Sequence, residues 1–366
     1  MSSSTRFTAR FRARFATPEE IEHWDEHVTA NPNGGNLLQS AAFAAVKRNF
    51  GWDIRYLVLE ADGTSSYNLV LEKSFPMLGR LWYLIKGPDV ASVEDIPPAL
   101  EAVKEFAARE KLRVFAVKIE PDIVDSDEAR AVLGGAGLVK SFNLQPNDST
   151  ALLDISPEPN QLLRNLHSRG RNAVRRAQRE GVEVEEAEPT LENYRTMHSL
   201  MTGTLNTKSR NGAQVRSFEY YRQFWTEFTS RGQGRLYFVY ENGRPSVGAF
   251  VINYGRKGTY KDGGSLQKRG QYGDSHLVQW TAIQDMKDLG CTEYDFCGTP
   301  PADQLKDTSH PFHGLGLFKT SFSKTVTDFV GVWDYPIDAA RYTAWTTAGE
   351  RVARQLHTRR TGQQFY

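Results

Sequence analysis

Residues 236–254 (LYFVYENGRPSVGAFVINY) and 56–72 (YLVLEADGTSSYNLVLE) are the two stretches that decide the fold we predict. Each contains two runs of apolar, aromatic and β-branched residues, which are typical of strands, around a turn at Asn242-Gly243 or Asp62-Gly63. Because the two hairpins have similar spacing, the sequence indicates that one α/β unit occurs twice in the chain.

The segments that follow each hairpin extend this pattern. In each half, a strand is followed by a helix and then by a second, buried strand. These predicted elements are Leu81–Ile85, Pro97–Glu110 and Val114–Ile119 in the first half, and Gly258–Gly264, Ser275–Lys287 and Glu293–Cys297 in the second. The order over residues 258–297 resembles the acyl-CoA N-acetyltransferases, or GNAT enzymes. The predicted fold class is therefore α/β, with two tandem GNAT-like domains whose mixed sheets are flanked by helices.

The length of 366 residues favours two domains, because single cores rarely grow beyond about 250–300 residues. A Pro-containing linker, Ser156-Pro157-Glu158-Pro159, marks the expected boundary. We predict a first domain over residues 1–155 and a second over residues 156–336. Pro336 opens a last predicted helix, residues 337–366, which we expect to pack back on the first domain.

The composition is that of an ordinary soluble globular protein, with 39% hydrophobic and 24% charged residues. A net charge of +1 does not by itself indicate a polyanionic partner. Only a local cluster of positive charge could indicate one. Two cysteines, Cys291 and Cys297, exclude a disulfide scaffold, and we interpret both as core residues. No apolar run approaches the ~20 residues of a membrane-spanning helix. A cytoplasmic location is the prediction.

The N-terminal stretch is basic, with arginines at positions 6, 10, 12 and 14 and phenylalanines at positions 7, 11 and 15. Three interpretations stay open. The first is a tail that runs into a first strand, the second is a contact with RNA or with anionic lipid as a peripheral membrane surface, and the third is a transit peptide.

The loop Gln267–Tyr272 occupies the place of the GNAT loop that binds the pyrophosphate of CoA. Such loops hold phosphates on free backbone N–H groups at a helix N-terminus, and they need small residues for close approach. Here Tyr272 stands where a small residue is required. The sequence therefore predicts a retained fold without CoA binding.

The strongest local charge signal is an arginine-rich segment that contains no acidic residue from Gln161 to Arg179. An apolar stripe of Leu163, Leu166, Val174 and Ala177 predicts one amphipathic helix whose other face binds an RNA backbone. The arginines of this face that we assign to RNA are Arg169, Arg171, Arg175 and Arg176. The alternative is a solvated face, offset by the glutamates that follow the segment.

Motifs for other chemistries are weak or absent. His23-x-x-Glu26-His27 has the spelling of one zinc-protease motif, but Trp24 fits the core face of an ordinary helix, and we predict no metal. No nucleophile elbow, P-loop or Cys-His pair occurs in the sequence. Non-covalent acyl transfer remains, which requires two positioned substrates and a cation or N–H group for the developing oxyanion.

Four stretches in order resemble the Fem family of peptidoglycan-bridge aminoacyltransferases. They are Asn36–Lys47 (NLLQSAAFAAVK), Lys86-Gly87-Pro88, the arginine-rich segment that ends at Gly181-Val182, and Gly314–Phe322 (GLGLFKTSF). The likeness covers roughly residues 16–350. The chain resembles the compact members, since it has no charged heptad insertion of the ~60 residues that form a coiled-coil arm in other members.

The resemblance implies roles for individual residues. Substrate-binding residues would be Lys47 at a diphosphate, Arg216 and Tyr220 at the acceptor, and Tyr260 and Phe318 beside them. Lys319 would be catalytic, near the reacting carbonyl. Glu120 would be a second catalytic residue, although some members carry an aspartate there. Asp262 occupies an aromatic position of the family, and simple strand alternation places it on the same face as Tyr260.

The function that the resemblance implies is transfer of an amino acid from aminoacyl-tRNA to the stem-peptide amine of UDP-MurNAc-pentapeptide or lipid II, in the building of interpeptide bridges. An ester donor is already activated, so we expect no cofactor and no metal. Three alternatives stay open: the same chemistry on a peptidyl antibiotic or a protein N-terminus, a CoA-dependent N-acetyltransferase, and a non-enzymatic RNA-binding module.

Overall fold

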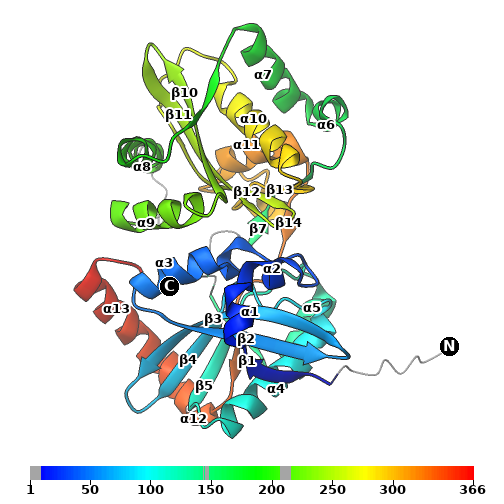
Figure 1. Ribbon diagram of the computed structural model, residues 1–366, viewed down its shortest axis with the longest axis vertical. Coiled ribbons are helices and arrows are strands. Elements are labelled where there is room, and N and C mark those ends of the chain that lie inside the picture. The colour runs from blue at the N-terminus through cyan, green and yellow to red at the C-terminus, as the bar shows by residue number, and fades with distance from the viewer. Residues whose placement is uncertain (1–9, 143, 145–147, 207–215) are drawn as a thin grey trace, which may run out of the picture. The chain divides into compact units, whose positions relative to one another are not determined.

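The computed structural model describes residues 10–142, 144, 148–206 and 216–366. The chain divides into two compact units, unit 1 with residues 1–144 and 329–366, and unit 2 with residues 145–328. Each unit is a mixed sheet with helices packed on it (Figure 1). The predicted fold class, α/β with mixed sheets flanked by helices, is confirmed.

The sheet of unit 1 has seven strands in the order β1-β2-β3-β4-β5-β15-β6. Strands β1 to β4 form an antiparallel meander, whereas β4 and β5 are parallel and α4 connects them. The strands are β1 (Arg12–Phe15), β2 (Asp53–Ala61), β3 (Thr64–Phe75), β4 (Gly79–Leu84), β5 (Val114–Ile119), β6 (Val139–Lys140) and β15 (Trp333–Pro336). The helices are α1 (Pro18–Glu22), α2 (Trp24–Thr29), α3 (Ala41–Asn49), α4 (Ile96–Arg109) and α5 (Asp127–Gly135), with short 3-10 turns at Leu37–Gln39 and Val93–Asp95.

The N-terminal strand β1 contains part of the basic stretch. Arg14 forms ion pairs with Glu20 and Glu60, each at 2.7 Å, and the Phe15 ring packs edge-on against Phe106 with 4.9 Å between centroids. Arg6 and Phe7 of the same stretch lie outside the described residues. The described part of the stretch is therefore a strand on the core of unit 1.

The last part of the chain returns to unit 1. Strand β15 pairs antiparallel with β5, opposite residues 116–119. Beyond it lie α12 (Ala339–Ala344), a π-helical turn (Trp345–Gly349) and α13 (Glu350–Thr361). The Trp345 ring lies 4.6 Å from Phe75, and Phe365 lies 5.6 Å from Trp52, so this segment covers aromatic side chains of unit 1.

The sheet of unit 2 repeats the arrangement with six strands in the order β8-β13-β12-β11-β10-β9. Strands β9 to β12 are antiparallel, β12 and β13 are parallel, and α10 connects the parallel pair. The strands are β8 (Leu152–Asp154), β9 (Val184–Ala187), β10 (Gly234–Glu241), β11 (Arg244–Tyr254), β12 (Lys257–Ser265) and β13 (Glu293–Asp295), while β7 (Ser149–Thr150) and β14 (Thr327–Asp328) pair separately.

The helices of unit 2 lie on the two faces of its sheet. One face packs against the arginine-rich segment, α10 and α11, because alternate residues of β11 (Val247, Ala249 and Val251) share a buried cluster with them. The other face meets α8 and α9, where Gly248 approaches Met197 and the Phe250 ring lies 5.9 Å from Trp225. The helices are α6 (Pro159–Asn165), α7 (Ser168–Arg179), α8 (Leu191–Asn206), α9 (Phe218–Thr229), α10 (Asp274–Asp288) and α11 (His313–Ser323), with a 3-10 turn at Ala302–Gln304.

The single amphipathic helix predicted from Gln161 to Arg179 is wrong in one respect. The segment forms two helices, α6 and α7, with a break at Leu166-His167. The imidazole of His167 accepts a hydrogen bond from the backbone N–H of Arg169 and so begins α7. Of the predicted apolar stripe, Leu166, Val174 and Ala177 are buried, and Leu163 is partly buried.

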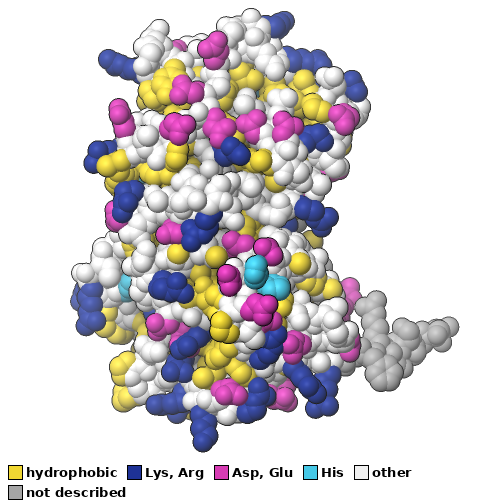
Figure 2. All heavy atoms as spheres, in the orientation of Figure 1, with side chains coloured by type: hydrophobic (Ala, Val, Ile, Leu, Met, Phe, Trp, Pro, Cys, Tyr) yellow, Lys and Arg dark blue, Asp and Glu magenta, His cyan; other side chains and the backbone are white. Residues whose placement is uncertain are grey.

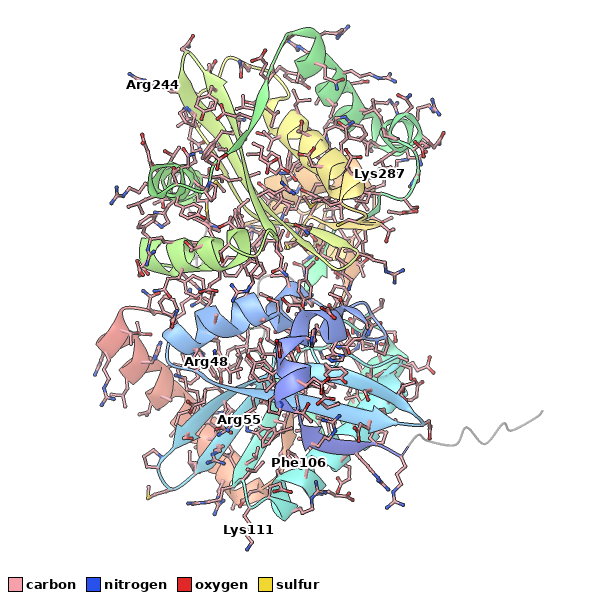
Figure 3. The ribbon with its side chains drawn as sticks, in the orientation of Figure 1. Arg48, Arg55, Phe106, Lys111, Arg244 and Lys287 are labelled. Carbon is pink, nitrogen blue, oxygen red and sulfur yellow. The ribbon has the colours of Figure 1, made fainter. Side chains whose placement is uncertain are left out.

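Charged side chains of both signs alternate over the visible face of each unit (Figure 2). Among them, Lys287 extends from α10 and donates to the backbone carbonyls of Ile155 and Ser156, at 3.3 and 2.8 Å, which fixes the chain after β8 (Figure 3). In the part of the chain that the structure describes, no helix is long and apolar enough to cross a membrane. The longest described helix, α8, has 16 residues, so these residues include no coiled-coil arm.

Candidate functional site

Where β11 and β12 pair, residues 257–265 of β12 lie opposite residues 247–254 of β11, so β12 has one extra residue, and this β-bulge organises the candidate site. Val251 lies opposite Tyr260 and Phe250 lies opposite Asp262, so Lys261 has no partner in the ladder. A bulge interrupts the alternation of side chains along a strand. Tyr260 therefore shares the face of Val251, whereas Asp262 shares the face of Phe250.

The prediction that Tyr260 and Asp262 lie on one face of the strand is wrong for this reason. Tyr260 packs on the cluster formed with α10 and α11. The Asp262 carboxylate instead accepts a hydrogen bond of 2.9 Å from the Trp225 indole of α9. Simple alternation holds only in a strand without a bulge, and the sequence alone does not mark the extra residue.

Strands β12 and β13 part immediately before Tyr260. Their parallel register covers Lys257 to Thr259 on β12, opposite residues 293–295 of β13. Beyond this point the edge of β12 carries Tyr260 and Lys261, and the chain after β13 turns at Cys297, which has a left-handed φ of 55°. An opening between two parallel strands at their carboxyl ends is where α/β sheets commonly bind ligands.

Lys319 lies at the end of β13. Its ammonium donates hydrogen bonds to the carbonyl oxygens of Cys297 and Gly298, at 2.9 and 2.7 Å, and lies 5.9 Å from the Tyr260 ring centroid. The side chain is buried. Two predicted residues, Lys319 and Tyr260, are therefore adjacent at the parting of the strands, where a fixed cation can stabilise a developing negative charge.

Phe318 precedes Lys319 on α11 and packs on the core of unit 2. Its ring meets His276 of α10 edge-on at 4.9 Å, and His276 also stacks on Phe322 at 5.6 Å. Burial, with a further effect of the Arg169 charge, lowers the pKa of His276 to about 4. The imidazole therefore stays neutral at physiological pH, and it supports the helix that carries Lys319.

Arg216 and Tyr220 lie at the beginning of α9, where Ser217 is the N-cap residue. The Arg216 guanidinium lies 4.5 Å from the Tyr220 ring centroid, a cation–π contact. Tyr220 is buried and contacts Tyr221 edge-on at 5.9 Å. These two predicted residues are thus brought together on α9, and Tyr221 extends the aromatic surface toward β12.

The ion pair of Lys261 and Asp262 is a feature that the predicted site residues did not include. The Lys261 ammonium lies 3.1 Å from Asp262 Oδ1 and 5.0 Å from the Phe224 ring centroid, so it points toward α9. Burial opposes its charge, but Asp262 and the nearby phenols of Tyr221 and Tyr220 outweigh that effect and raise the pKa of Lys261. A charged Lys-Asp pair inside a buried strand is the sequence signal that could have identified it.

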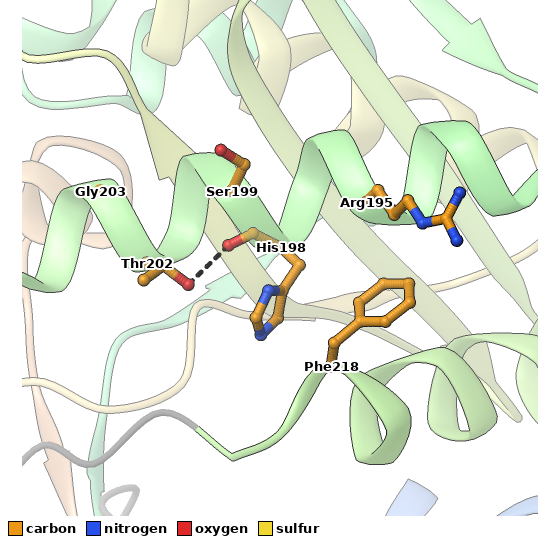
Figure 4. Close-up of a pocket in the computed structure, with 6 residues that line it drawn as sticks. All are labelled: Arg195, His198, Ser199, Thr202, Gly203 and Phe218. Carbon is orange, nitrogen blue, oxygen red and sulfur yellow. Dashed lines mark hydrogen bonds between the residues drawn. The ribbon is translucent and has the colours of Figure 1, made fainter.

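A pocket of about 500 Å³ lies on α8 and the beginning of α9 (Figure 4). The His198 ring lies between Phe218 and Tyr221, at 5.4 and 5.7 Å, so Tyr221 joins this pocket to the cluster around Lys261. Its lining residues are Arg195, His198, Ser199, Thr202, Gly203 and Phe218. None of the predicted site residues lines the pocket.

The arginines of α7 differ in what they contact. Arg169 and Arg171 donate to backbone carbonyls, those of Leu317 at 2.6 Å and Arg164 at 2.9 Å, and so stabilise the helices around them. Arg176 pairs with Glu180 at 2.6 Å. Arg175 is exposed. Of the four arginines predicted to bind RNA, Arg175 and Arg176 project from the outer face of the helix.

The GNAT pyrophosphate loop is already occupied by the protein's own groups. Glu241 Oε1 accepts a hydrogen bond of 2.6 Å from the backbone N–H of Gly270, a position where a phosphate oxygen would bind. The exposed Tyr272 ring lies 4.3 Å from the Arg176 guanidinium. A carboxylate and an aromatic ring therefore take the place of the anion, and these residues do not fit CoA.

The N-terminus of α10 is closed by α7 in the same region. Gly273, the N-cap residue, has a φ of 79°, and a Cβ atom there would lie 2.4 Å from the carbonyl oxygen of Ala173. Arg269 pairs with the buried Asp274 at 2.9 Å. The backbone of α7 therefore lies directly against the beginning of α10.

The two predicted residues of unit 1 lie on different elements, Lys47 on α3 and Glu120 directly after β5. Glu120 is buried at the end of β5, accepts a hydrogen bond from the Tyr83 hydroxyl and lies 3.9 Å from Lys86. Lys86 also pairs with Asp122 at 3.2 Å. Glu120 is thus part of a buried ion-pair cluster, in which the Lys86-Gly87-Pro88 motif provides the cation.

Lys47 is buried on α3, where its ammonium lies 5.3 Å from the Phe43 ring centroid. The histidine motif of the same unit is split, because His23 lies between α1 and α2 and His27 stacks on Tyr67 at 4.3 Å. Within the described residues, no group of three or more His, Cys, Asp or Glu side chains could hold a metal ion.

Comparison with known proteins gives matches in both halves of the chain. Residues 19–131 match the FemAB family, and residues 164–307 match the acetyltransferase (GNAT) domain. The lipid II:glycine glycyltransferase of Staphylococcus aureus (strain MRSA252) is 25% identical over 402 residues, which cover 88% of this chain and 92% of that protein. These matches support a place for this chain in the Fem family.

Solved structures share the fold of this chain. The crystal structure of FemX superposes with a TM-score of 0.74 at 21% identity and covers 91% of this chain and 99% of FemX. A conserved protein of unknown function from Bacteroides thetaiotaomicron has a TM-score of 0.54 at 11% identity and covers 88% of this chain and 98% of its own. The fold of two tandem units is therefore shared with these structures.

The neutral state of His276 predicts a pH dependence of stability. Its folded pKa of about 4 lies below the unfolded value of 6.5. The unfolded state therefore binds the proton first, and stability is lost as the pH falls from 6.5 toward 4. Between pH 7.5 and pH 5 this loss is about 2 kcal/mol. In urea unfolding at both pH values, His276→Gln should reduce the pH-dependent difference by that amount, and an unchanged difference contradicts the prediction.

Proposed function

We propose that the chain is an aminoacyltransferase that moves an amino acid from aminoacyl-tRNA to the stem-peptide amine of a peptidoglycan precursor. The observation that carries the proposal is the adjacency of Lys319 and Tyr260 where β12 and β13 part, in a chain related over 88% of its length to a lipid II:glycine glycyltransferase. The acceptor is UDP-MurNAc-pentapeptide or lipid II, and the reaction takes place in the cytoplasm.

The proposed reaction is direct attack. The nitrogen of the stem-peptide amine adds to the ester carbonyl carbon of the aminoacyl-tRNA. The bond from this carbon to the ribose oxygen then breaks, an amide forms, and the proton of the amine passes to the oxygen of the leaving tRNA. Lys319 stabilises the oxyanion, because its ammonium is held in place by the carbonyls of Cys297 and Gly298 before the reaction begins. Neither ATP nor a metal ion is required for an ester donor.

Other residues hold the substrates in the proposal. Arg216 and Tyr220 bind the acceptor on α9, and Tyr260 and Phe318 line the region around Lys319. Lys47 binds the diphosphate of the precursor. Glu120 is a buried, ion-paired carboxylate and therefore a poor general base. In the proposal it acts indirectly, through its ion pair with Lys86. The outer arginines of α7 bind the tRNA backbone.

Exchange of Lys319 for methionine tests the catalytic proposal. Loss of a preorganised cation at the oxyanion should lower kcat by about 10²–10³-fold while the KM for the acceptor changes little. The assay mixes the protein with radiolabelled aminoacyl-tRNAs and with nucleotide-linked or lipid-linked muramyl pentapeptide. The matched control is Lys306→Met at an exposed lysine of the same unit. If Lys319→Met retains more than a tenth of the wild-type kcat, Lys319 does not have this role.

Binding of tRNA tests the role of α7. The double variant Arg175→Ala/Arg176→Ala should bind tRNA about tenfold more weakly at low salt, and the slope of log K against log salt should fall by about 1–2, because fewer phosphate counterions are released. Filter binding over a salt series measures both quantities. Arg130→Ala, at an exposed arginine of α5, is the control. An unchanged salt slope would place the tRNA elsewhere.

The alternative of a CoA-dependent acetyltransferase has a simple test. Since Glu241 already accepts the Gly270 N–H and α7 closes the N-terminus of α10, acetyl-CoA should give no heat in calorimetry up to millimolar concentration. An acetyl-CoA-dependent enzyme of the same fold serves as positive control. Saturable binding of acetyl-CoA would restore this alternative.

A further inference from the structure

The extra residue of the β12 bulge, Lys261, presents a cation that the proposed mechanism does not use. Its side chain is 27% exposed, whereas that of its partner Asp262 is 6% exposed. An ammonium has three N–H donors. Asp262 Oδ1 takes one of them at 3.1 Å, and among the described residues the Lys261 ammonium makes no other hydrogen bond. Asp262 therefore holds the Lys261 ammonium on one side, and the remaining N–H donors are available to a ligand.

Asp262 is itself fixed from the opposite direction. Its Oδ2 accepts from the Trp225 indole at 2.9 Å, so the two carboxylate oxygens bind two different groups. Trp225 is fully buried, and its ring packs at a tilt against that of Tyr221, with 5.3 Å between centroids. This chain of contacts from α9 through Asp262 holds the Lys261 ammonium over the Phe224 ring, at 5.0 Å from its centroid. Such second contacts are what make a binding group rigid.

The place of Lys261 points to the acceptor as its ligand. It follows Tyr260 directly, and the Tyr260 ring lies 5.9 Å from the Lys319 ammonium. It also shares with Arg216 an electrostatic effect on the Tyr221 phenol, whose pKa is raised to about 12 by burial and by Asp262. Lys261 is therefore one residue along β12 from Tyr260 of the proposed reaction centre, where β12 and β13 part, and its side chain lies on the α9 face with the proposed acceptor residues. The arginines of α7, like Tyr260, lie on the opposite face of the sheet.

The chemistry of the side chain favours a carboxylate. Arginine suits the two-pronged binding of a phosphate, whereas lysine is a compact point charge that pairs with a single anionic oxygen. Stem peptides contain carboxylates at their C-terminus and, where the third residue is a diamino diacid, beside the accepting amine. We infer that Lys261 binds a carboxylate of the acceptor stem peptide, with Asp262 and Trp225 as positioning residues; this inference rests on the proposed function.

The test combines substitution of the lysine with amidation of the substrate. Wild type and Lys261→Met are assayed with four muramyl pentapeptides: one with lysine as third residue, one with the diamino diacid, and two derivatives of the latter with either the side-chain or the C-terminal carboxylate amidated. Lys257→Met, at the other end of β12, is the matched control. Acceptor binding is measured by calorimetry beside the transfer rate.

The expected result is that the effect of substrate amidation on KM disappears when Lys261 is replaced. In wild type, amidation of the carboxylate that Lys261 binds should raise the acceptor KM about tenfold or more, the usual order for a charge-assisted hydrogen bond. In Lys261→Met the same amidation should have no effect, and the KM for the free acid should equal that of the wild type for the amide. The amidated position that shows this pattern identifies the carboxylate, and Lys261→Arg should restore part of the preference.

Two results overturn the inference. One is an equal response of wild type and Lys261→Met to every amidation, which would also be the outcome if Lys261 binds a phosphate. The other is a wild-type chain that neither binds nor transfers to any acceptor, which overturns the proposed function together with this inference. Because Lys261→Met leaves Asp262 without its cation, the double variant Lys261→Met/Asp262→Asn is assayed as well. In this variant the amide oxygen of the new asparagine can still accept the Trp225 hydrogen bond. The variant must likewise show no effect of amidation on KM.

Discussion

One additional residue in β12 determines where the side chains of the unit 2 site point. Without the bulge, Tyr260 and Asp262 would share a face, and Lys261 would lie on the opposite one. With it, Tyr260 faces α11 and Lys319, while Lys261 and Asp262 both reach α9. The parting of β12 from β13 begins at the same place. The backbone of one strand thus sets both the opening in the sheet and the groups around it.

The two units share one arrangement of strands but differ in how exposed the charged groups at the strand ends are. In each, a parallel pair of strands carries charged groups at its carboxyl end: Glu120 and Lys86 in unit 1, and Lys319 with Lys261 and Asp262 in unit 2. The unit 1 cluster is closed, since Glu120 and Lys86 are both buried and pair with each other and with neighbours. The unit 2 group includes a partly exposed cation, Lys261. The same position of the duplicated fold is thus a closed ion-pair cluster in unit 1 and leaves one cation partly exposed in unit 2.

The sequence predicted much of the fold because its signals are local. The strand runs around Asn242-Gly243 and Asp62-Gly63 are each visible in a few residues. The site was harder, because its residues come together through register. Neither the bulge at Lys261 nor the break at His167 has a distinctive local pattern, and the carboxylate of Glu241 that fills the Gly270 loop is 29 residues away. The assignment of roles to single residues stays a prediction.

The return of β15 to the sheet of unit 1 has a consequence for how the chain is made. On the ribosome, β5 emerges long before residues 333–336, and its outer edge must wait for all of unit 2 to be synthesised before its neighbour arrives. An unpaired strand edge can join strands of other molecules. The nascent chain therefore carries an open β5 edge for roughly 200 residues of synthesis, at ~5–20 residues per second. Strand order in this protein makes the N-terminal unit the last to be completed.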